Sequence, residues 1–499
     1  MAPSQMIPQH FPSLPQFSHF MKPSRFEGET NYLEVIGTIP PEVRGTFYRV
    51  MPDPHLPSRV KDDPWFNGDG NVSAFRFESG KVHFKQRYVR TEKFIKECES
   101  GRALLGKYKN KFTDAIEFTV RTTANTNIVF FNGKLLACKE DALPYEMDPV
   151  TLETIGLYDF NGQLPSLTFT AHPKLDPVTK EFIGFGYEAK GDGTPDICYF
   201  SVDPLGNFTD LVWLVSPVVA MIHDFAVTEN YAIVLFPLIP HTCDLERMEA
   251  GGEHWQWTPN IPLYIGVLPR RGAKGSDIKW FRAPNAFPGH TSNAFEKNGK
   301  IFFDLPVGKK NVFFWWPDSQ GNAPSPQEVA CHLSRFIIDP SSDNLELQSA
   351  EILSSEDVEF PRIDERFLSR EHNHAFFCLN DDTAPTIWPT VVAKMDGGHP
   401  VYNSIGRLNL RTRQFDKYFP GNKHLVQETV FIPRSSGAAE GEGYLLFLVN
   451  NYETMLSELH LVDTDNFTRP LAVILLPLRL RQGLHGNWVD DEDLKLARY

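Results

Sequence analysis

Short apolar or alternating runs, each bounded by Gly, Pro, Asn or Asp, recur along the sequence from Tyr32 onward. Runs of about four to eight residues that end at turn-forming residues are typical of β-strands. The predicted strands are Thr46–Val50, Ser73–Phe77, Lys81–Tyr88, Asn127–Phe131, Lys134–Cys138, Glu181–Tyr187, Ile197–Val202, Ala232–Phe236, Lys300–Leu305, Tyr444–Val449 and Leu471–Leu476. Only Glu97–Tyr108 and Met248–His254 qualify as helix candidates. The sequence therefore predicts an all-β protein.

So many strands in one chain must protect their edges, because an exposed edge pairs with other chains. A closed barrel, a sandwich of two sheets and a propeller of radially repeated sheets all do so. We find no repeated signature at a period of about 40–50 residues, so the sequence leaves these architectures open. Five prolines in residues 1–30 predict an irregular N-terminal arm. No Gly- or Ser-rich linker divides the rest, so we expect one domain over residues 31–499.

Charge and composition limit the classes of function. The net charge of −14 argues against a nucleic acid partner. The apolar runs stop short of the ~18–20 residues that a membrane span needs, and the N-terminus lacks the pattern of a secretory signal peptide. The six cysteines contain no Cys-x-x-Cys pair, which is typical of reduced thiols. We therefore expect a cytoplasmic protein without integral membrane association.

Four of the 16 histidines lie beside strand-like runs or in glycine-bounded turns: His172, His223, His290 and His485. Neutral imidazole is a common ligand of divalent iron, copper or zinc. Their separations of 51, 67 and 195 residues match no local metal motif, so spacing alone leaves buried structural histidines as the simpler reading. A rival pair is His372 and His374, because residues two apart in a strand face the same way. Histidines in polar or Pro-rich stretches, His241 and His254 among them, are expected to be solvent-exposed.

Three carboxylates stand beside strand-like segments: Glu140, Glu359 and Glu428. A histidine that binds a metal usually donates its other ring N–H to an acceptor that fixes its tautomer. These glutamates are therefore candidates for orienting the histidines. The alternative is that each simply faces solvent from a strand.

Ten short stretches, taken in their order along the chain, carry a family resemblance. They are Val35–Pro40, Gly45–Arg49, Val50–Pro54, Trp65–Gly70, Thr123–Asn127, Gly133–Ala137, Ala171–Pro173, His223–Phe225, His290–Glu296 and Gly483–Gly486. Together they resemble the carotenoid cleavage oxygenase family, over about Val35 to Trp488, and within it the lignostilbene and resveratrol dioxygenase branch. The family usually continues its opening strand with Asn-Gly-Pro, whereas Val50–Pro54 resembles the stilbene branch. Asn67 stands where the family's turn usually has Asp.

The resemblance implies a seven-bladed β-propeller, with inserted loops and short helices capping one face over an axial metal site. It implies one Fe(II) per chain, held by His172, His223, His290 and His485. It also implies that three of the four imidazoles are oriented by Glu140, Glu359 and Glu428. The implied reactants are a small phenolic substrate and O2, with no flavin or haem.

The stilbene-cleaving branch places a Tyr/Lys pair on the 4-hydroxyl of its substrate, and Tyr108 and Lys139 match that pair. A buried lysine readily lowers its pKa and takes the phenol's proton. The phenolate then pushes electron density onto the central double bond, whose cleavage with O2 gives two aromatic aldehydes. Thr126 matches a threonine near the iron, and Phe66 is placed to stack on a substrate ring. The resemblance thus implies three catalytic residues, Tyr108, Lys139 and Thr126.

One tension accompanies these roles. Lys139 and Glu140 are neighbours, and neighbours in a regular strand point to opposite faces. A strand end or bulge at this position would let both reach the site. A solvent-exposed Lys139 would remove the phenol assignment.

Three other functions remain open. A carotenoid or apocarotenoid oxygenase shares the reaction class and differs in substrate. Isomerohydrolase chemistry on retinoid esters is disfavoured, because Gly101–Lys111 is polar and basic and makes a poor membrane patch. A metal-free propeller that acts as a binding scaffold would not need the four histidines and three glutamates.

Overall fold

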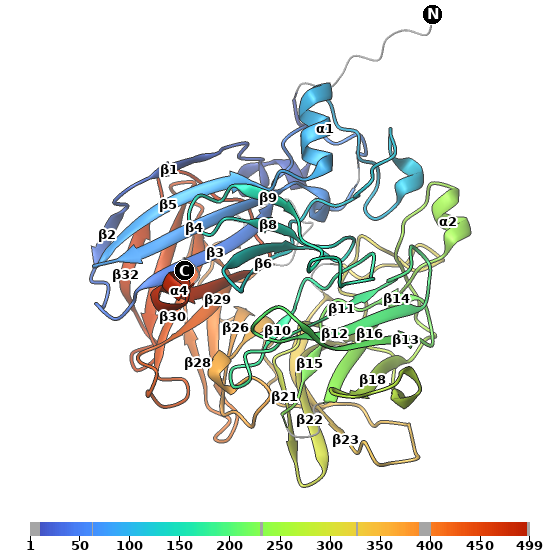
Figure 1. Cartoon of the computed structure of the whole chain (residues 1–499). Coiled ribbons are helices and arrows are strands. Elements are labelled where there is room, and N and C mark those ends of the chain that lie inside the picture. The colour runs from blue at the N-terminus through green and yellow to red at the C-terminus, as the bar shows by residue number, and fades with distance from the viewer. Residues whose placement is uncertain (1–9, 62, 230–232, 326–327, 389–400, 497–499) are drawn as a thin grey trace, which may run out of the picture.

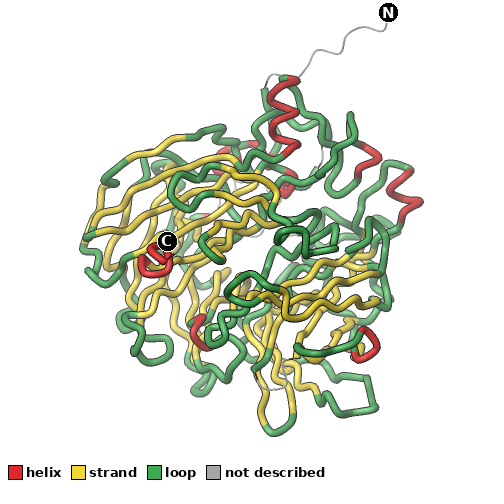
Figure 2. The backbone as a smooth tube through the Cα atoms, viewed as in Figure 1, coloured by secondary structure: helices red, strands yellow, loops and turns green. Residues whose placement is uncertain are grey.

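The strands of this computed structural model form seven sheets arranged around a common axis, which is a seven-bladed β-propeller (Figure 1). The structure describes residues 10–61, 63–229, 233–325, 328–388 and 401–496. Strands dominate these ranges and helices are few (Figure 2). The expected all-β propeller is therefore confirmed.

The first three sheets use residues 28–215 and the strand closest to the C-terminus. The first contains β1 (Gly28–Thr30), β5 (Lys81–Tyr88), β4 (Gly70–Glu78), β3 (Gly45–Pro52) and β33 (Gly486–Asp490). The second contains β6 (Asn127–Phe131), β7 (Lys134–Cys138), β8 (Tyr145–Met147) and β9 (Thr154–Leu157). The third contains β10 (Lys174–Leu175), β11 (Phe182–Tyr187), β12 (Asp196–Val202) and β13 (Phe208–Val215).

The other four sheets complete the ring. The fourth contains β14 (Ala220–Met221), β15 (Ala226–Val227), β16 (Ile233–Thr242), β17 (Gln256–Trp257), β18 (Leu263–Pro269) and β19 (Lys279–Ala283). The fifth contains β20 (Phe287–Pro288), β21 (Asn293–Lys297), β22 (Lys300–Gly308), β23 (Cys331–Ile338) and β24 (Glu351–Ile352). The sixth contains β25 (Asp357–Arg362), β26 (His374–Asn380), β27 (Ser404–Asn409) and β28 (Phe415–Tyr418). The seventh contains β2 (Glu34–Gly37), β32 (Pro470–Leu475), β31 (Leu456–Asp463), β30 (Gly443–Asn451) and β29 (His424–Pro433).

Strands from both ends of the chain close the ring. β33, close to the C-terminus, pairs antiparallel with β3 in the first sheet. β2, close to the N-terminus, pairs antiparallel with β32 in the seventh sheet. The first and last sheets are thus each completed by a strand from the opposite end of the sequence, so neither depends on local hairpins alone.

Helices lie outside the sheets. They are α1 (Glu92–Ser100), α2 (Leu245–Glu249) and α4 (Asp491–Leu496), with short 3-10 turns η1 (Pro15–Phe17), η2 (His19–Met21), η3 (Trp65–Asn67), η4 (Lys111–Thr113), η5 (Gly275–Asp277) and η7 (Glu365–Phe367). In the expected arm, residues 1–9 lie outside the described ranges, and residues 10–30 contain η1, η2 and β1, which pairs with β5. Within the described ranges, no helix is long and apolar enough to cross a membrane.

Both predicted helices are shifted toward the C-terminus relative to the observed ones. α1 begins after Thr91, whose side chain accepts a hydrogen bond from the Phe94 N–H, and it ends at Gly101 in the left-handed region (φ 66°). α2 begins after Asp244, which caps it in the same manner. Cap residues rather than apolar periodicity therefore set these boundaries. The predicted strand from Ala232 begins outside the described residues, and β16 continues from Ile233 to Thr242.

Candidate metal centre and cavity

The structure brings His172, His223, His290 and His485 together on the propeller axis, with one ring nitrogen of each within 4.8 Å of the others. The Nε2 atoms of His172 and His223 are 3.2 Å apart, and those of His223 and His290 are 3.0 Å apart. Each histidine lies next to a strand at one edge of its sheet: β10, β14, β20 and β33. Four blades thus contribute one imidazole each.

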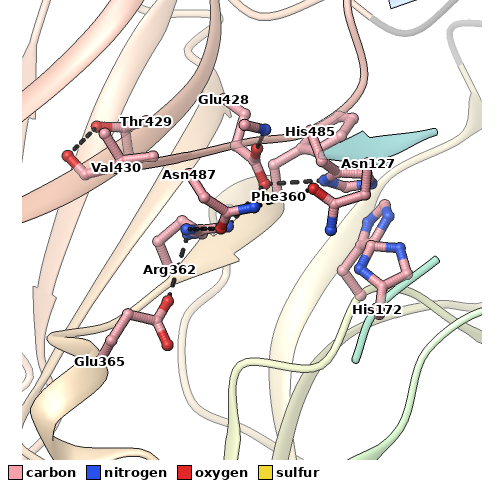
Figure 3. A network of polar contacts seen from close by, with 12 residues as sticks. Asn127, His172, Phe360, Arg362, Glu365, Glu428, Thr429, Val430, His485 and Asn487 are labelled. Atoms are coloured by element: carbon pink, nitrogen blue, oxygen red, sulfur yellow. Dashed lines mark hydrogen bonds and ion pairs between the residues drawn. The ribbon is translucent and has the colours of Figure 1, made fainter. Parts of the chain in front are cut away.

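Three of these imidazoles contact a buried carboxylate through Nδ1. His290 Nδ1 donates to Glu359 Oε2 at 2.8 Å, and His485 Nδ1 donates to Glu428 Oε1 at 3.0 Å (Figure 3). His223 Nδ1 makes the same contact with Glu140. A hydrogen on Nδ1 leaves the Nε2 lone pair free, so these contacts direct the donor atoms toward a common point.

Electrostatics keeps these donors suited to a cation. Burial lowers the pKa of His172 well below its ordinary value and the pKa of His485 to about 4, so both rings are neutral at pH 7. Burial opposes ionisation of Glu428, yet His485 and Arg362 lower its pKa below the ordinary value. Figure 3 shows Arg362 beside this carboxylate, with Nη1 3.5 Å from Glu428 Oε1. Burial opposes a charge on His290, yet Glu359 raises its pKa above the ordinary value. The centre therefore combines two imidazoles that are neutral at pH 7, those of His172 and His485, with ionised carboxylates.

The donor set fits a divalent metal ion. His485 Nε2 is buried without a hydrogen-bond partner among the described residues, a costly state for a polar atom that a metal ion relieves. Four imidazole nitrogens suit divalent iron, copper or zinc. In the described ranges, neither His372 nor His374 joins any cluster of three potential metal ligands.

A mostly aromatic cavity opens beside His223, His290 and His485, and its empty space is about 940 Å³ with the open solvent at its mouth included. Its lining includes Trp65, Phe66, Tyr108, Thr126, Glu140, Phe287, Phe313, Trp315, Trp316, Phe360, Tyr402 and Gln482. The loops that carry Tyr108 and Phe313–Trp316 are insertions beside the first and fifth sheets, and they cap the axial site as the resemblance implies.

Lys139 lies behind Tyr108 rather than in solvent. Its Nζ is 5.0 Å from the centroid of the Tyr108 ring, donates to Thr123 Oγ1 at 2.7 Å and pairs with Asp141 Oδ2 at 3.1 Å. Only 3% of Lys139 and 3% of Glu140 is exposed, because β7 ends at Cys138 and strand alternation no longer applies. The strand end therefore lets Glu140 line the cavity, while Lys139 is buried beside the Tyr108 ring and is not among the residues that line the cavity.

Two expectations about histidines were wrong. His241 and His254 are both fully buried, not exposed. His241 packs against aromatic rings of the cavity wall, including Phe313 and Trp316. His254 Nε2 lies 3.0 Å from the Glu188 carboxylate. Flanking polar residues misled the prediction, because burial here is decided by inserted loops that pack on the blades.

Sequence reasoning also missed three contributors to the site. Phe360 stacks on His290, with ring centroids 5.0 Å apart. The wall formed by Phe313, Trp315 and Trp316 could have been found, because the four successive aromatic residues 313–316 stand out in the sequence. Tyr187, whose hydroxyl donates to Glu140 Oε2 at 2.6 Å, gave no local signal.

A propeller with four axial histidines defines a class of metal-dependent oxygenases, and the comparisons place the chain within it. The chain belongs to the carotenoid cleavage oxygenase family, since the family model described as retinal pigment epithelial membrane protein matches residues 21–490. It is 61% identical to resveratrol cleavage oxygenase 1 of Aspergillus fumigatus over 486 residues, 97% of each chain.

Two further relatives agree with this placement. The chain is 57% identical to carotenoid cleavage oxygenase 1 of Neurospora crassa, over 98% of this chain and 94% of that relative. The crystal structure of Pseudomonas brassicacearum lignostilbene dioxygenase superposes with a TM-score of 0.93 at 43% identity, covering 96% of this chain and 99% of the other. Family and fold therefore agree.

Proposed function

We propose that this protein is an Fe(II)-dependent dioxygenase that cleaves the central C=C bond of 4-hydroxystilbenes such as resveratrol, piceatannol or lignostilbenes. One stilbene and one O2 give two aromatic aldehydes. The observation that carries the proposal is the buried Tyr108, which lines a cavity that reaches His223, His290 and His485, with the buried Lys139 5.0 Å from the centroid of its ring. The names of the Aspergillus fumigatus and Pseudomonas brassicacearum relatives support it.

The metal in this proposal is one Fe(II) per chain, held by His172, His223, His290 and His485. When bound, divalent iron supplies the chemistry that activates O2. The four clustered imidazoles, the three glutamates whose pKa lies below the ordinary value and the unpartnered His485 Nε2 support a divalent ion at this place.

Substrate binding is assigned to the aromatic walls and to Tyr108. Phe66 lies 6.3 Å from the Tyr108 ring, centroid to centroid, so a phenol placed against Tyr108 meets an aromatic neighbour. Burial and nearby carboxylates raise the pKa of Tyr108 well above its ordinary value, so its hydroxyl keeps its proton and donates a hydrogen bond to the substrate's 4-oxygen.

Proton transfer is assigned to Lys139. Burial lowers its pKa, although Asp141 opposes this, so Lys139 Nζ accepts the phenol's proton and returns it when the aldehyde forms. The resulting phenolate sends electron density through the ring onto the central double bond. Thr126 lines the cavity and is assigned to limiting what occupies the space beside the metal. Apolar walls keep water away from the reacting bond.

The proposal extends to organisation and location. Residues 31–499 form one oxygenase domain preceded by the arm of residues 1–30. All six cysteines, each within the described ranges, are unpaired, which supports a cytoplasmic location. The partners are the phenolic substrate and O2, without nucleic acid or integral membrane association.

The test is to incubate iron-loaded protein with resveratrol in air and to identify the products. The expected result is loss of stilbene absorbance with formation of 4-hydroxybenzaldehyde and 3,5-dihydroxybenzaldehyde. The second candidate is an apocarotenoid oxygenase, which the name of the Neurospora crassa relative favours. Cleavage of an apocarotenal and not of resveratrol by the iron-loaded protein would replace the first proposal with the second. Absence of bound iron after loading would refute both.

A further inference from the structure

The three carboxylates of the metal centre are held in two different ways. Glu359 and Glu428 each accept a backbone N–H from the segment that carries their own histidine, at 3.1 and 2.9 Å. Glu140 instead accepts a hydrogen bond from a side chain, the Tyr187 hydroxyl, at 2.6 Å. The orientation of Glu140 therefore depends on one phenolic oxygen at the end of β11.

The ring of the same tyrosine faces a buried cation. Lys109 Nζ lies 4.7 Å from the Tyr187 ring centroid and 5.1 Å from that of Trp255. It also pairs with Glu188 Oε2 at 2.8 Å, where 2% of each side chain is exposed. A cation held between aromatic faces and a carboxylate away from water is strongly localised.

Lys109 is fixed at its backbone as well as at its ammonium group. His254 Nε2 contacts the carboxylate of Glu188, and His254 Nδ1 lies 2.9 Å from the carbonyl oxygen of Lys109. Burial opposes the charge on Lys109, yet Glu188 raises its pKa above the ordinary value, so the ammonium persists. One buried carboxylate therefore contacts both Lys109 and His254.

This fixed residue directly follows Tyr108, the proposed phenol ligand. Lys109 has a left-handed backbone (φ 51°), which turns its side chain away from the cavity that Tyr108 lines. On the other side, the Tyr108 N–H donates to Asp63 Oδ1 at 2.9 Å. The direction of Tyr108 is thus set by Asp63 before it and by Lys109 after it.

We propose that Tyr187 and Lys109 are positioning residues that connect the substrate end of the cavity to its metal end. Tyr187 fixes the carboxylate of Glu140, and that carboxylate orients His223. Lys109 holds Tyr108 in place and packs on the opposite part of Tyr187. The inference rests on the proposed function, because the two ends have these meanings only if a metal and a phenol bind there.

The first experiment removes one oxygen atom. Tyr187→Phe deletes the hydrogen bond to Glu140 and keeps the ring that faces Lys109. The matched control is Tyr199→Phe, because Tyr199 is equally buried in the neighbouring strand and its hydroxyl donates to the Arg270 carbonyl at 2.8 Å, away from the site. Metal-free protein is titrated with Co(II) alone, with affinity and visible absorption as readouts.

We expect the affinity of Tyr187→Phe for Co(II) to fall about tenfold, because partners that orient a ligand typically change metal affinity by about 10–100-fold. Its Co(II) absorption bands should shift as His223 reorients, and kcat for resveratrol in the iron-loaded enzyme should fall more than KM rises. Tyr199→Phe should match the wild type in all three. Equal affinity and spectra for the two variants would overturn the inference alone.

The second experiment addresses the substrate end. Lys109→Met removes the ammonium while keeping an unbranched stem, and should raise KM for resveratrol, whereas Lys109→Arg keeps a cation over the aromatic faces and should restore it. The double variant of Lys109→Met with Tyr187→Leu, which removes the ring that Lys109 faces, should lose less than the product of the single losses, because each single change already abolishes the contact between the two side chains. Multiplicative losses in folded variants would overturn the connection between the ends. A wild type that binds no metal would overturn the proposed function itself.

Discussion

The two ends of the cavity are constructed by different means. The metal end collects histidines from four blades, spread from residue 172 to residue 485. The end proposed to bind the phenol collects Phe66 and Tyr108, with Lys139 beside the Tyr108 ring, from turns and loops within residues 63–141. Residues that come from four blades keep their arrangement as long as the propeller keeps its fold. Residues on loops can be exchanged by substitutions in those loops alone. Reaction class and substrate choice are therefore separable in this molecule.

The largest expected effect comes from breaking the metal end. His485→Ala removes one imidazole and leaves Glu428 without its partner, so iron binding and stilbene cleavage should both be abolished. Metal content and resveratrol turnover measure this. His460→Gln is the control, because His460 of the seventh blade is also buried but bonds Tyr418 of the sixth blade, and this variant should keep its iron. A His485→Ala variant with a full iron content would contradict the assignment.

A smaller and more selective effect is expected at the phenol end. Lys139→Met should lower kcat/KM for resveratrol by about 100-fold, the size of a lost proton-transfer group, with metal content unchanged. Lys134→Met is the control, because Lys134 lies in the adjacent strand and pairs with Glu146 at the surface. Cleavage of an apocarotenal need not suffer. Undiminished resveratrol cleavage would place the proton transfer elsewhere.

The smallest expected effect is a change in the stability of the protein with pH, which arises from Asp63 at the proposed phenol end. Burial raises the pKa of Asp63, which holds the Tyr108 N–H, from 3.8 to about 7. A raised pKa contributes stability that is fully present below about pH 4 and is lost as pH rises through about 7. Asp63→Asn cannot titrate, so its free energy of unfolding relative to the wild type should increase by about 2 kcal/mol from pH 5 to pH 7.5. Denaturant unfolding at both pH values measures this, and a constant difference would refute it.

Local chemistry explains how well the sequence predicted the strands. β5, β6 and β7 have the predicted bounds. The β6–β7 hairpin turns at Asn132 and Gly133, which both have positive φ. An Asn-Gly pair between two strand-like runs is a strong sequence signal for a hairpin. The propeller itself was not visible, because its blades share no repeated motif and two are completed by strands from opposite chain ends.

The residues of the site also differ in whether local sequence could predict their contacts. Spacing could not join His290 to His485 across 195 residues, and only the resemblance to a family did so. The contact between Tyr187 and Glu140 follows from how the second and third blades meet. The residues that flank Tyr187 and Glu140 in the sequence do not indicate that the two side chains are in contact. Burial of His254 was missed for the same reason.

The pairing of β33 with β3 also orders events during synthesis. Ribosomes release the N-terminal part of a chain first, and this part begins to fold before the rest exists. His485 directly precedes β33, so the last ligand is made hundreds of residues after β3. A chain that has not yet reached residue 485 therefore has neither a complete first blade nor the fourth histidine of the cluster.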